Sequence, residues 1–236
     1  MDLHLFSTLK MENNIFAIVA HPDDEVLGCG GTLARHVKNG DSVSVLFLAD
    51  GEGSRLSNSQ ADQTKASSRE AMAHKAGDTI GIKDRFFLCL PDNKMDSVPF
   101  LDIVQQIEPY VKRIRPKIIY THHAGDLNID HRLTHQAVIT ANRPQPGSNV
   151  STILCFETPS STEWQPPGSD TPFCPNWFVD ISSTLGIKIA ALEEYAPEVR
   201  QWPHARSIQA VQALAKWRGS SIGVNAAEAF VLARHI

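Results

Sequence analysis

Short apolar runs rich in β-forming residues alternate with helical patterns over residues 15–142. Each run is separated from the next by far more residues than a hairpin turn needs, so neighbouring strands should pair in parallel, with helices on both faces of the sheet. This alternation predicts a Rossmann-like three-layer α/β/α sandwich with a mostly parallel sheet. The expected strands are residues 15–20, 42–49, 85–90 and 117–121, and the expected helices are residues 26–38, 61–76, 100–114 and 131–142.

The rest of the chain is less regular. A proline-rich loop over residues 159–175 is expected on the surface near the mouth of the site. No internal repeat and no long linker interrupts the 236 residues, so we expect one domain spanning 1–236. The remaining expected elements are strands at 152–156, 177–180 and 229–233 and helices at 185–195 and 207–218.

Charge and hydropathy exclude two classes of partner. A formal net charge of −4 offers no general attraction to nucleic acid or anionic lipid, because both bind clustered Lys and Arg side chains. No run of about 18 apolar residues occurs, and the start of the sequence lacks the features of a signal peptide. We therefore expect a cytoplasmic protein with no nucleic-acid partner and no stable membrane insertion. The four cysteines lie far apart and are expected to be reduced, with Cys29, Cys89 and Cys155 in the core.

Three loops that follow expected strands carry many polar side chains. They are residues 21–25 (HPDDE), 50–55 and 122–131. Because the carboxyl ends of parallel strands meet at one rim of the sheet, where such folds bind ligands, the three loops should open on one crevice.

The first of these loops indicates a metal site. Carboxylates and an imidazole directly behind a buried strand are costly without a partner, and a divalent cation is the simplest one. The H-x-x-D spacing lets His21 and Asp24 turn toward one point, and His131 can supply a third ligand from the facing loop. Such a set leaves positions open, as catalytic zinc sites do. The alternative is that these residues only cap the helix beginning at Val26, but capping needs one side chain and this stretch offers four.

Three segments of the chain resemble one known family. AHPDDEVLGCGGTLARH (residues 20–36) resembles the signature of the PIG-L/LmbE family of zinc-dependent N-deacetylases, GDLNIDHRLTHQAV (125–138) resembles the second zinc-binding block of bacterial members, and NAAEAF near the end resembles their C-terminal segment. The resemblance implies one Zn²⁺ per chain, or another divalent metal, held by His21, Asp24 and His131. It implies Asp23 as the general base toward the metal-activated water.

The resemblance also implies a substrate class and an assembly. The expected substrate is a small N-acetylated sugar, namely the N-acetylglucosamine unit of a conjugate, nucleotide sugar or glycan precursor. Relatives are often trimers or hexamers, which suggests a homo-oligomer by analogy.

Three further residues take expected roles from the resemblance. Many relatives have an oxyanion-stabilising histidine where this chain has Asn128, which can donate a hydrogen bond but carries no charge. Asp130 is expected to hydrogen-bond His131 or a neighbour instead of binding the metal. Arg69 aligns with an arginine that faces the active site in relatives; it either contacts the substrate or the tetrahedral intermediate, or pairs with a nearby acid on an exposed helix.

Several histidines lie near the expected site. The adjacent side chains of His122 and His123 diverge at a strand end, so at most one should face the metal. His135 follows His131 by one helical turn, yet we expect a packing or supporting role because hydrolysis needs open metal positions. His204 either reaches the sugar or lies on the surface. The remaining candidates are Gly28, Gly30 and Gly31 for close helix packing and Trp164, Phe173 and Trp177 for sugar stacking, core packing or an oligomer contact.

Two other functions fit parts of this pattern. A zinc amidohydrolase for a different amide, such as a thiol conjugate or an aminoglycoside precursor, would carry the same site. A Rossmann-like module that binds a nucleotide or metal without turnover is the third reading. Asp23 argues against it, because a pure binding site has no use for an extra carboxylate beside the ligand carboxylate.

Overall fold

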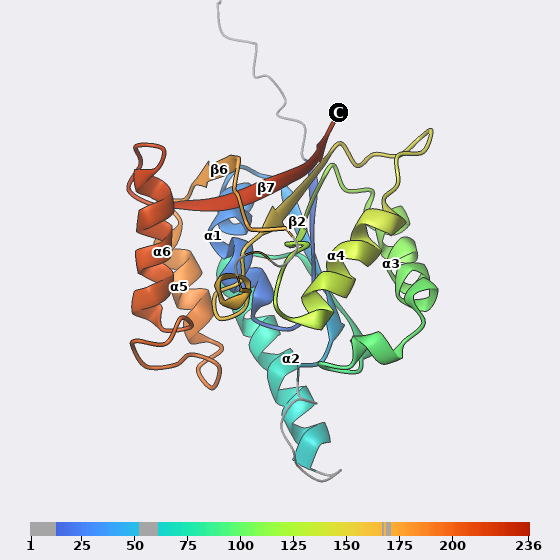
Figure 1. Ribbon diagram of the computed structural model, residues 1–236, viewed down its shortest axis with the longest axis horizontal. Helices are drawn as coiled ribbons and strands as arrows, with labels where there is room; N and C mark the ends of the chain where they lie inside the picture. Colours follow the sequence, from blue (N-terminus) through green and yellow to red (C-terminus); the bar gives the residue numbers. More distant parts are fainter. Residues whose placement is uncertain (1–12, 52–60, 167, 169–170) are drawn as a thin grey trace, which may run out of the picture.

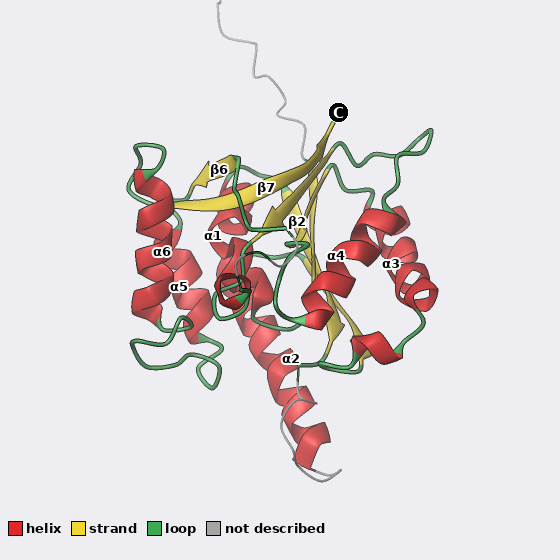
Figure 2. Ribbon diagram, in the orientation of Figure 1, coloured by secondary structure: helices red, strands yellow, loops and turns green. Residues whose placement is uncertain are grey.

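A computed structural model of the protein describes residues 13–51, 61–166, 168 and 171–236. These residues form a seven-stranded sheet of order β3-β2-β1-β4-β5-β7-β6, with helices on both faces (Figures 1 and 2). Strands β1 to β5 run parallel, and β7 is antiparallel to β5 and β6. The expected Rossmann-like, mostly parallel fold is therefore confirmed. The strands are β1 (Asn14–Val19), β2 (Ser42–Ala49), β3 (Asp84–Leu90), β4 (Ile118–His122), β5 (Thr152–Phe156), β6 (Trp177–Asp180) and β7 (Ala227–His235), and the α-helices are α1 (Asp24–Lys38), α2 (Ala61–Ile80), α3 (Phe100–Ile114), α4 (Ile129–Ala141), α5 (Leu185–Glu193) and α6 (Ile208–Ser220).

The side chains of β1 explain why helices cover both faces of the sheet. Ile15, Ala17 and Val19 enter a core shared with α1, α2, α5 and α6, whereas Phe16 and Ile18 enter a second core shared with α3 and α4. All five are fully buried. A strand that is apolar on both faces needs a helical layer on each. Figure 1 shows α3 and α4 on one side of the sheet and α1, α5 and α6 on the other.

The winding of the sheet reverses between β1 and β4. The chain leaves β1 to form β2 and β3 on one side, and β4 then pairs with the other edge of β1. The loops after β1 and β4 consequently part at the carboxyl ends of these strands, which is where open α/β sheets bind their ligands. The polar segments 20–23 and 123–128 are these two loops.

Two sequence predictions about this part of the molecule are wrong. Helix α2 does not end at residue 76 but continues to Ile80 and stops at Gly81, whose φ is +90° and whose N–H bonds the carbonyl of Gly77 at 2.9 Å. Gly77 lies inside the helix, and the side chain of Arg85 occupies the space that a Cβ at this position would need. Cys89 is exposed because β3 is an edge strand, while Cys29 and Cys155 are buried as expected.

The remaining differences concern the ends of elements. Strand β7 is longer at both ends than the expected 229–233, and α4 begins before the expected residue 131. Most of the expected loop at 50–55 lies outside the described residues. Across the described part of the chain, no helix has both the length and the apolar content needed to cross a membrane.

Candidate metal centre and active site

The loop after β1 turns sharply at Asp23. Its backbone is in the left-handed region, with φ of 112°, which costs energy for a residue with a side chain. The N–H of Asp23 is held by Glu25 Oε2 at 3.0 Å, and Glu25 Oε1 in turn accepts the Tyr195 hydroxyl at 2.6 Å. Asp23 occupies the N-cap position of α1, but its side chain makes no capping hydrogen bond within the described structure. The turn therefore presents the Asp23 carboxylate to the crevice instead of to the helix.

The structure brings His21, Asp24 and His131 together. Asp24 Oδ2 lies 3.3 Å from His21 Nδ1 and 3.4 Å from His131 Nε2. All three side chains are buried, and one donor atom from each lies within 4.8 Å of the others. The buried Asp24 Oδ1 and His131 Nε2 make no hydrogen bond within the described residues. Buried polar atoms without partners are rare, and a divalent cation between these groups would supply the missing partner.

Carboxylates support the far side of each imidazole. His21 Nε2 lies 3.1 Å from Asp92 Oδ1 and 3.1 Å from Asp130 Oδ2, and His131 Nδ1 lies 3.1 Å from Asp126 Oδ1. Such carboxylates orient metal-binding histidines and make them better ligands. Burial lowers the pKa of His131, but the nearby Asp24 and Asp126 raise it more strongly, to about 9.

Asp130 links the loops after β3 and β4. Its Oδ2 accepts the N–H of Asn93 at 2.7 Å, and its Oδ1 accepts the N–H of Met95 at 3.1 Å. The imidazole that Asp130 contacts is that of His21, whose Nε2 lies 3.1 Å from Asp130 Oδ2, so the supporting role stays a prediction. Asp126 is held similarly, since it accepts hydrogen bonds from Ser161 and from Thr162 Oγ1 in the proline-rich loop.

Asp23 faces a group of charged side chains that come from distant parts of the chain. Its Oδ2 accepts a hydrogen bond from Arg206 Nη1 at 3.0 Å, and Arg206 Nε donates to Ser160 Oγ at 2.7 Å. Arg69 is buried, and its Nη2 pairs with Glu198 Oε1 at 2.7 Å. Burial raises the pKa of Asp23 to about 6, against the lowering effect of Arg206. Arg69 is thus an internal residue near Asp23 and not an exposed helical arginine.

Asn128 is the N-cap of α4. Its Oδ1 accepts the N–H of Asp130 at 2.8 Å, and its Nδ2 donates to Asn93 Oδ1 at 3.2 Å. Helix capping is a common use of asparagine. The Asn128 NH₂ group carries two hydrogens, so the second can donate to an oxyanion while the first stays on Asn93.

The adjacent histidines at the end of β4 diverge. His122 Nε2 accepts the N–H of Ala20 at 2.9 Å and lies 3.3 Å from Asp24 Oδ2, and its ring stacks on that of His131 at 3.9 Å. Burial and the neighbouring His131 lower the pKa of His122 to about 4, so this imidazole is neutral. His123 points elsewhere and contacts the carbonyl oxygen of Thr171 at 2.9 Å.

The other candidate residues lie outside the metal cluster. His135 Nδ1 contacts the carbonyl oxygen of His122 at 2.9 Å. His204 Nδ1 accepts the N–H of Arg206 at 3.0 Å, and its ring packs edge-on against the exposed Trp164. Phe173 packs against His123 near the crevice, whereas Trp177 packs against the core beside His235. Gly28 and Gly31 have the expected packing role: a Cβ on Gly28 would overlap Phe156, and one on Gly31 would lie 2.8 Å from Ile181 Cδ1.

Four residues of this site were not predicted from the sequence. Asp92 follows β3 directly, so the rule that strand ends converge could have found it, and Asp126 stands in a polar loop without being singled out. Glu198 and Arg206 lie between α5 and α6, in a segment with no pattern that points to the site. Only the packing of that segment against the loop after β1 brings them there.

Comparisons with known proteins give one family match and several relatives. The matching family model is PIG-L, described as GlcNAc-PI de-N-acetylase, over residues 16–142. Uncharacterized deacetylase YaiS of Escherichia coli K12 is 28% identical over 83% of this chain and 97% of that protein. Diacetylchitobiose deacetylase of Thermococcus kodakarensis is 26% identical over 83% of this chain and 73% of that protein.

A further relative is named as a hydratase and not as a deacetylase, and a solved structure shares the fold. The 4-oxalmesaconate hydratase of Pseudomonas putida is 26% identical over 82% of this chain and 77% of that protein. The N,N'-diacetylchitobiose deacetylase from Pyrococcus horikoshii has a TM-score of 0.76 at 19% identity, over 93% of this chain and 83% of that chain.

Proposed function

The chain belongs to the PIG-L family, and from that premise we propose that it is a zinc-dependent N-deacetylase of an N-acetylglucosamine unit in a small conjugate, nucleotide sugar or glycan precursor. The observation that carries the proposal is the position of Asp23. It is a buried carboxylate next to a candidate metal site, and it is not itself part of that site. A site that only binds metal would not need it.

We assign the metal to His21, Asp24 and His131. These residues fit Zn²⁺ because two imidazoles and one carboxylate are its usual ligands in hydrolases. The buried Asp24 Oδ1 and His131 Nε2 also make no hydrogen bond within the described residues. When bound, Zn²⁺ would lower the pKa of a water molecule toward about 7 and polarise the acetamide carbonyl. Asp92, Asp126 and Asp130 hold the two imidazoles in place.

Asp23 moves the proton in this proposal. Its carboxylate accepts a proton as water attacks the carbonyl carbon, and it then donates that proton to the nitrogen of the leaving amine. Arg206 holds one oxygen of Asp23, which fixes the orientation of the carboxylate. Arg69, fixed by Glu198, places a second cation near Asp23, where negative charge develops on the substrate. Asn128 is assigned to oxyanion contact through the second hydrogen of its Nδ2, since the first is donated to Asn93.

The proline-rich loop supports a sugar substrate. It contacts the site through Ser161 and Thr162, and it brings Phe173 beside His123. An aromatic ring in this position suits the apolar face of a pyranose. Trp177 is assigned to the core and not to the sugar.

Acetate release measured on a panel of substrates tests the proposal. The panel contains N-acetylglucosamine, its nucleotide and small-molecule conjugates, diacetylchitobiose, acetylated thiol and aminoglycoside conjugates, and 4-oxalmesaconate. We expect acetate from at least one N-acetylated sugar, and we expect no release after chelation. Turnover of a non-sugar amide alone would favour the broader amidohydrolase reading, and hydration of 4-oxalmesaconate without any acetate release would contradict a deacetylase.

A further inference from the structure

Helix α1 is broken a few residues after the candidate site. Cys29 has backbone angles of φ −145° and ψ 15°, which are not helical. The break separates a short first part, which carries Asp24, from a longer second part that ends at Lys38. At such a break, carbonyls of the first part and N–H groups of the second part lose their partners within the helix.

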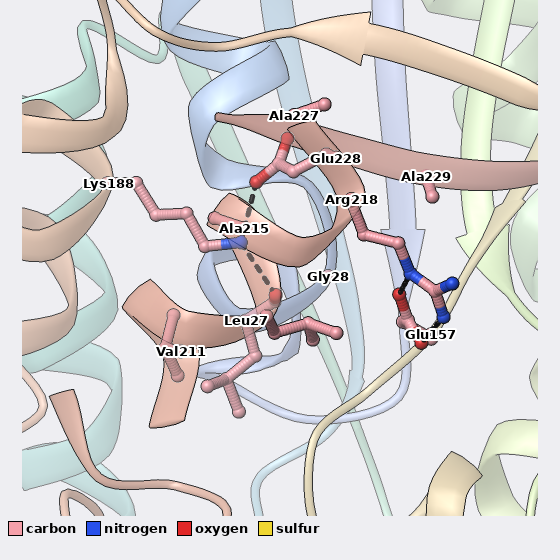
Figure 3. Close-up of a pocket in the computed structure, with 11 residues that line it drawn as sticks. Leu27, Gly28, Glu157, Lys188, Val211, Ala215, Arg218, Ala227, Glu228 and Ala229 are labelled. Atoms are coloured by element: carbon pink, nitrogen blue, oxygen red, sulfur yellow. Dashed lines mark hydrogen bonds and ion pairs between the residues drawn. The ribbon is translucent and has the colours of Figure 1, made fainter. Parts of the chain in front are cut away.

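A buried ion pair binds both sides of this break. Lys188 Nζ, from α5, donates to the carbonyl oxygen of Leu27 at 2.9 Å. Glu228, from β7, accepts the N–H of Gly31 at 3.0 Å and that of Thr32 at 2.7 Å. Figure 3 shows the Lys188 ammonium between Glu228 and the Leu27 carbonyl, and the two charged groups are 2.6 Å apart. Lys188 thus hydrogen-bonds the first part of α1, and Glu228 hydrogen-bonds the second part.

Stability alone does not explain this pair. Lys188 is 4% exposed and Glu228 is 5% exposed, so both charged groups are shielded from water. Burying two charges is costly, and well-packed apolar residues of the same volume are often at least as stable. What an apolar pair cannot do is bind one carbonyl and two N–H groups in fixed directions.

The contacts lead from this pair to the catalytic carboxylate. The N–H of Leu27, whose carbonyl Lys188 binds, donates to the carbonyl oxygen of Asp23 at 2.9 Å. That bond and the one from the N–H of Val26 at 3.1 Å hold the carbonyl of Asp23, whose backbone is left-handed. Asp24 begins the first part of α1, and Asp23 directly precedes it. A change in the angle between the two parts of α1 would therefore move the carboxylates of Asp23 and Asp24.

We propose that Lys188 and Glu228 are positioning residues, which hold the break in α1 and thereby set where Asp23 and Asp24 lie. The proposal rests on the deacetylase function proposed above, because it concerns the same site. Among the described residues, the side-chain hydrogen bonds of this pair go to each other and to the backbone of α1, and none goes to His21, Asp24 or His131.

The double variant Lys188→Met/Glu228→Gln removes both charges and keeps the volume of the side chains. Either single change would leave a buried charge without its partner, and such variants are expected to fold poorly. For the double variant we expect a melting temperature near that of the parent. We also expect about 10- to 100-fold weaker Zn²⁺ binding in competition with a chelator, the range found when supports of metal ligands are removed. The value of kcat should fall with little change in KM, since the loss affects groups that act in the reaction.

Amide hydrogen exchange supplies a readout that needs neither metal nor substrate. In the metal-free double variant, exchange should become faster over residues 24–32 and stay unchanged in β2 and α3. A parent that binds no zinc and releases no acetate would contradict the proposed function, while this exchange pattern would still test the positioning pair.

A matched control is the double variant Arg85→Met/Asp78→Asn. Arg85 Nη1 also binds a helix carbonyl, that of His74, and a carboxylate of Asp78, each at 2.7 Å, but it does so at the amino-terminal end of β3, away from the crevice. It should leave zinc binding and kcat unchanged. Parental zinc affinity, kcat and exchange in the Lys188/Glu228 double variant would overturn the proposal, and so would a general loss of stability with faster exchange throughout the chain.

Discussion

At the residue scale, the neighbours Asp23 and Asp24 are both buried, yet the two carboxyl groups have opposite properties. Burial raises the pKa of each. Around Asp24, the neighbouring imidazoles of His131 and His122 outweigh burial and hold the pKa of this carboxyl well below its usual range. Around Asp23, Arg206 offsets burial only in part. One carboxylate therefore suits a permanent ligand, and the other suits a group that gains and loses a proton.

Asp23→Asn separates these two roles. The amide keeps the size of the side chain, and its oxygen can still accept the Arg206 hydrogen bond, but it cannot take up a proton. We expect parental zinc content and a kcat lower by at least about 100-fold, because general acid–base assistance is commonly worth about 10²–10⁴-fold. Metal analysis and acetate release measure the two properties. A near-parental kcat would mean that another group carries the proton.

His131→Ala and His135→Ala form a matched pair one helical turn apart. His131 faces Asp24, while His135 contacts the carbonyl oxygen of His122. We expect the first variant to lose most of its zinc and the second to keep its zinc and a substantial part of its activity. The zinc content of the two purified variants measures this difference. A metal-free His135→Ala protein would reverse the ligand assignment.

At the scale of the element, α1 carries the first half of the site because its glycines let it lie against the sheet. Gly31→Ala would place a methyl group 2.8 Å from Ile181 Cδ1 and 3.0 Å from its Cβ, so we expect a loss of about 1–3 kcal/mol in the free energy of unfolding. Gly186→Ala, in α5, is the control because the added methyl group would have no packing neighbour within 4 Å. That change should be neutral or stabilise by up to about 1 kcal/mol. Chemical denaturation measures both, and equal effects would contradict the close packing of α1.

At the scale of the whole molecule, the proposed metal joins the segments that follow β1 and β4, and the carboxylates behind its ligands extend the connection to the loop after β3. Zinc that binds only the folded chain stabilises it by about 2.7 kcal/mol at 100 times its dissociation constant. For a chain of this length, that free energy corresponds to a rise of about 5–10 °C in Tm. Thermal unfolding with zinc and with a chelator measures the difference. An unchanged Tm would argue against a metal shared by these loops.

The sequence by itself determined the sheet, the crevice and the grouping of the three proposed metal ligands. Alternating apolar runs and helical patterns specify a parallel sheet, and a parallel sheet places the loops that hold His21, Asp24 and His131 at one rim. Tertiary structure decided which groups surround them. Arg206 meets Asp23 across 183 positions of sequence, and Glu228 meets Gly31 across 197. Such contacts leave no periodic pattern in the sequence. They depend on how the segments after β5 pack over α1, and only the packing of the complete chain determines that.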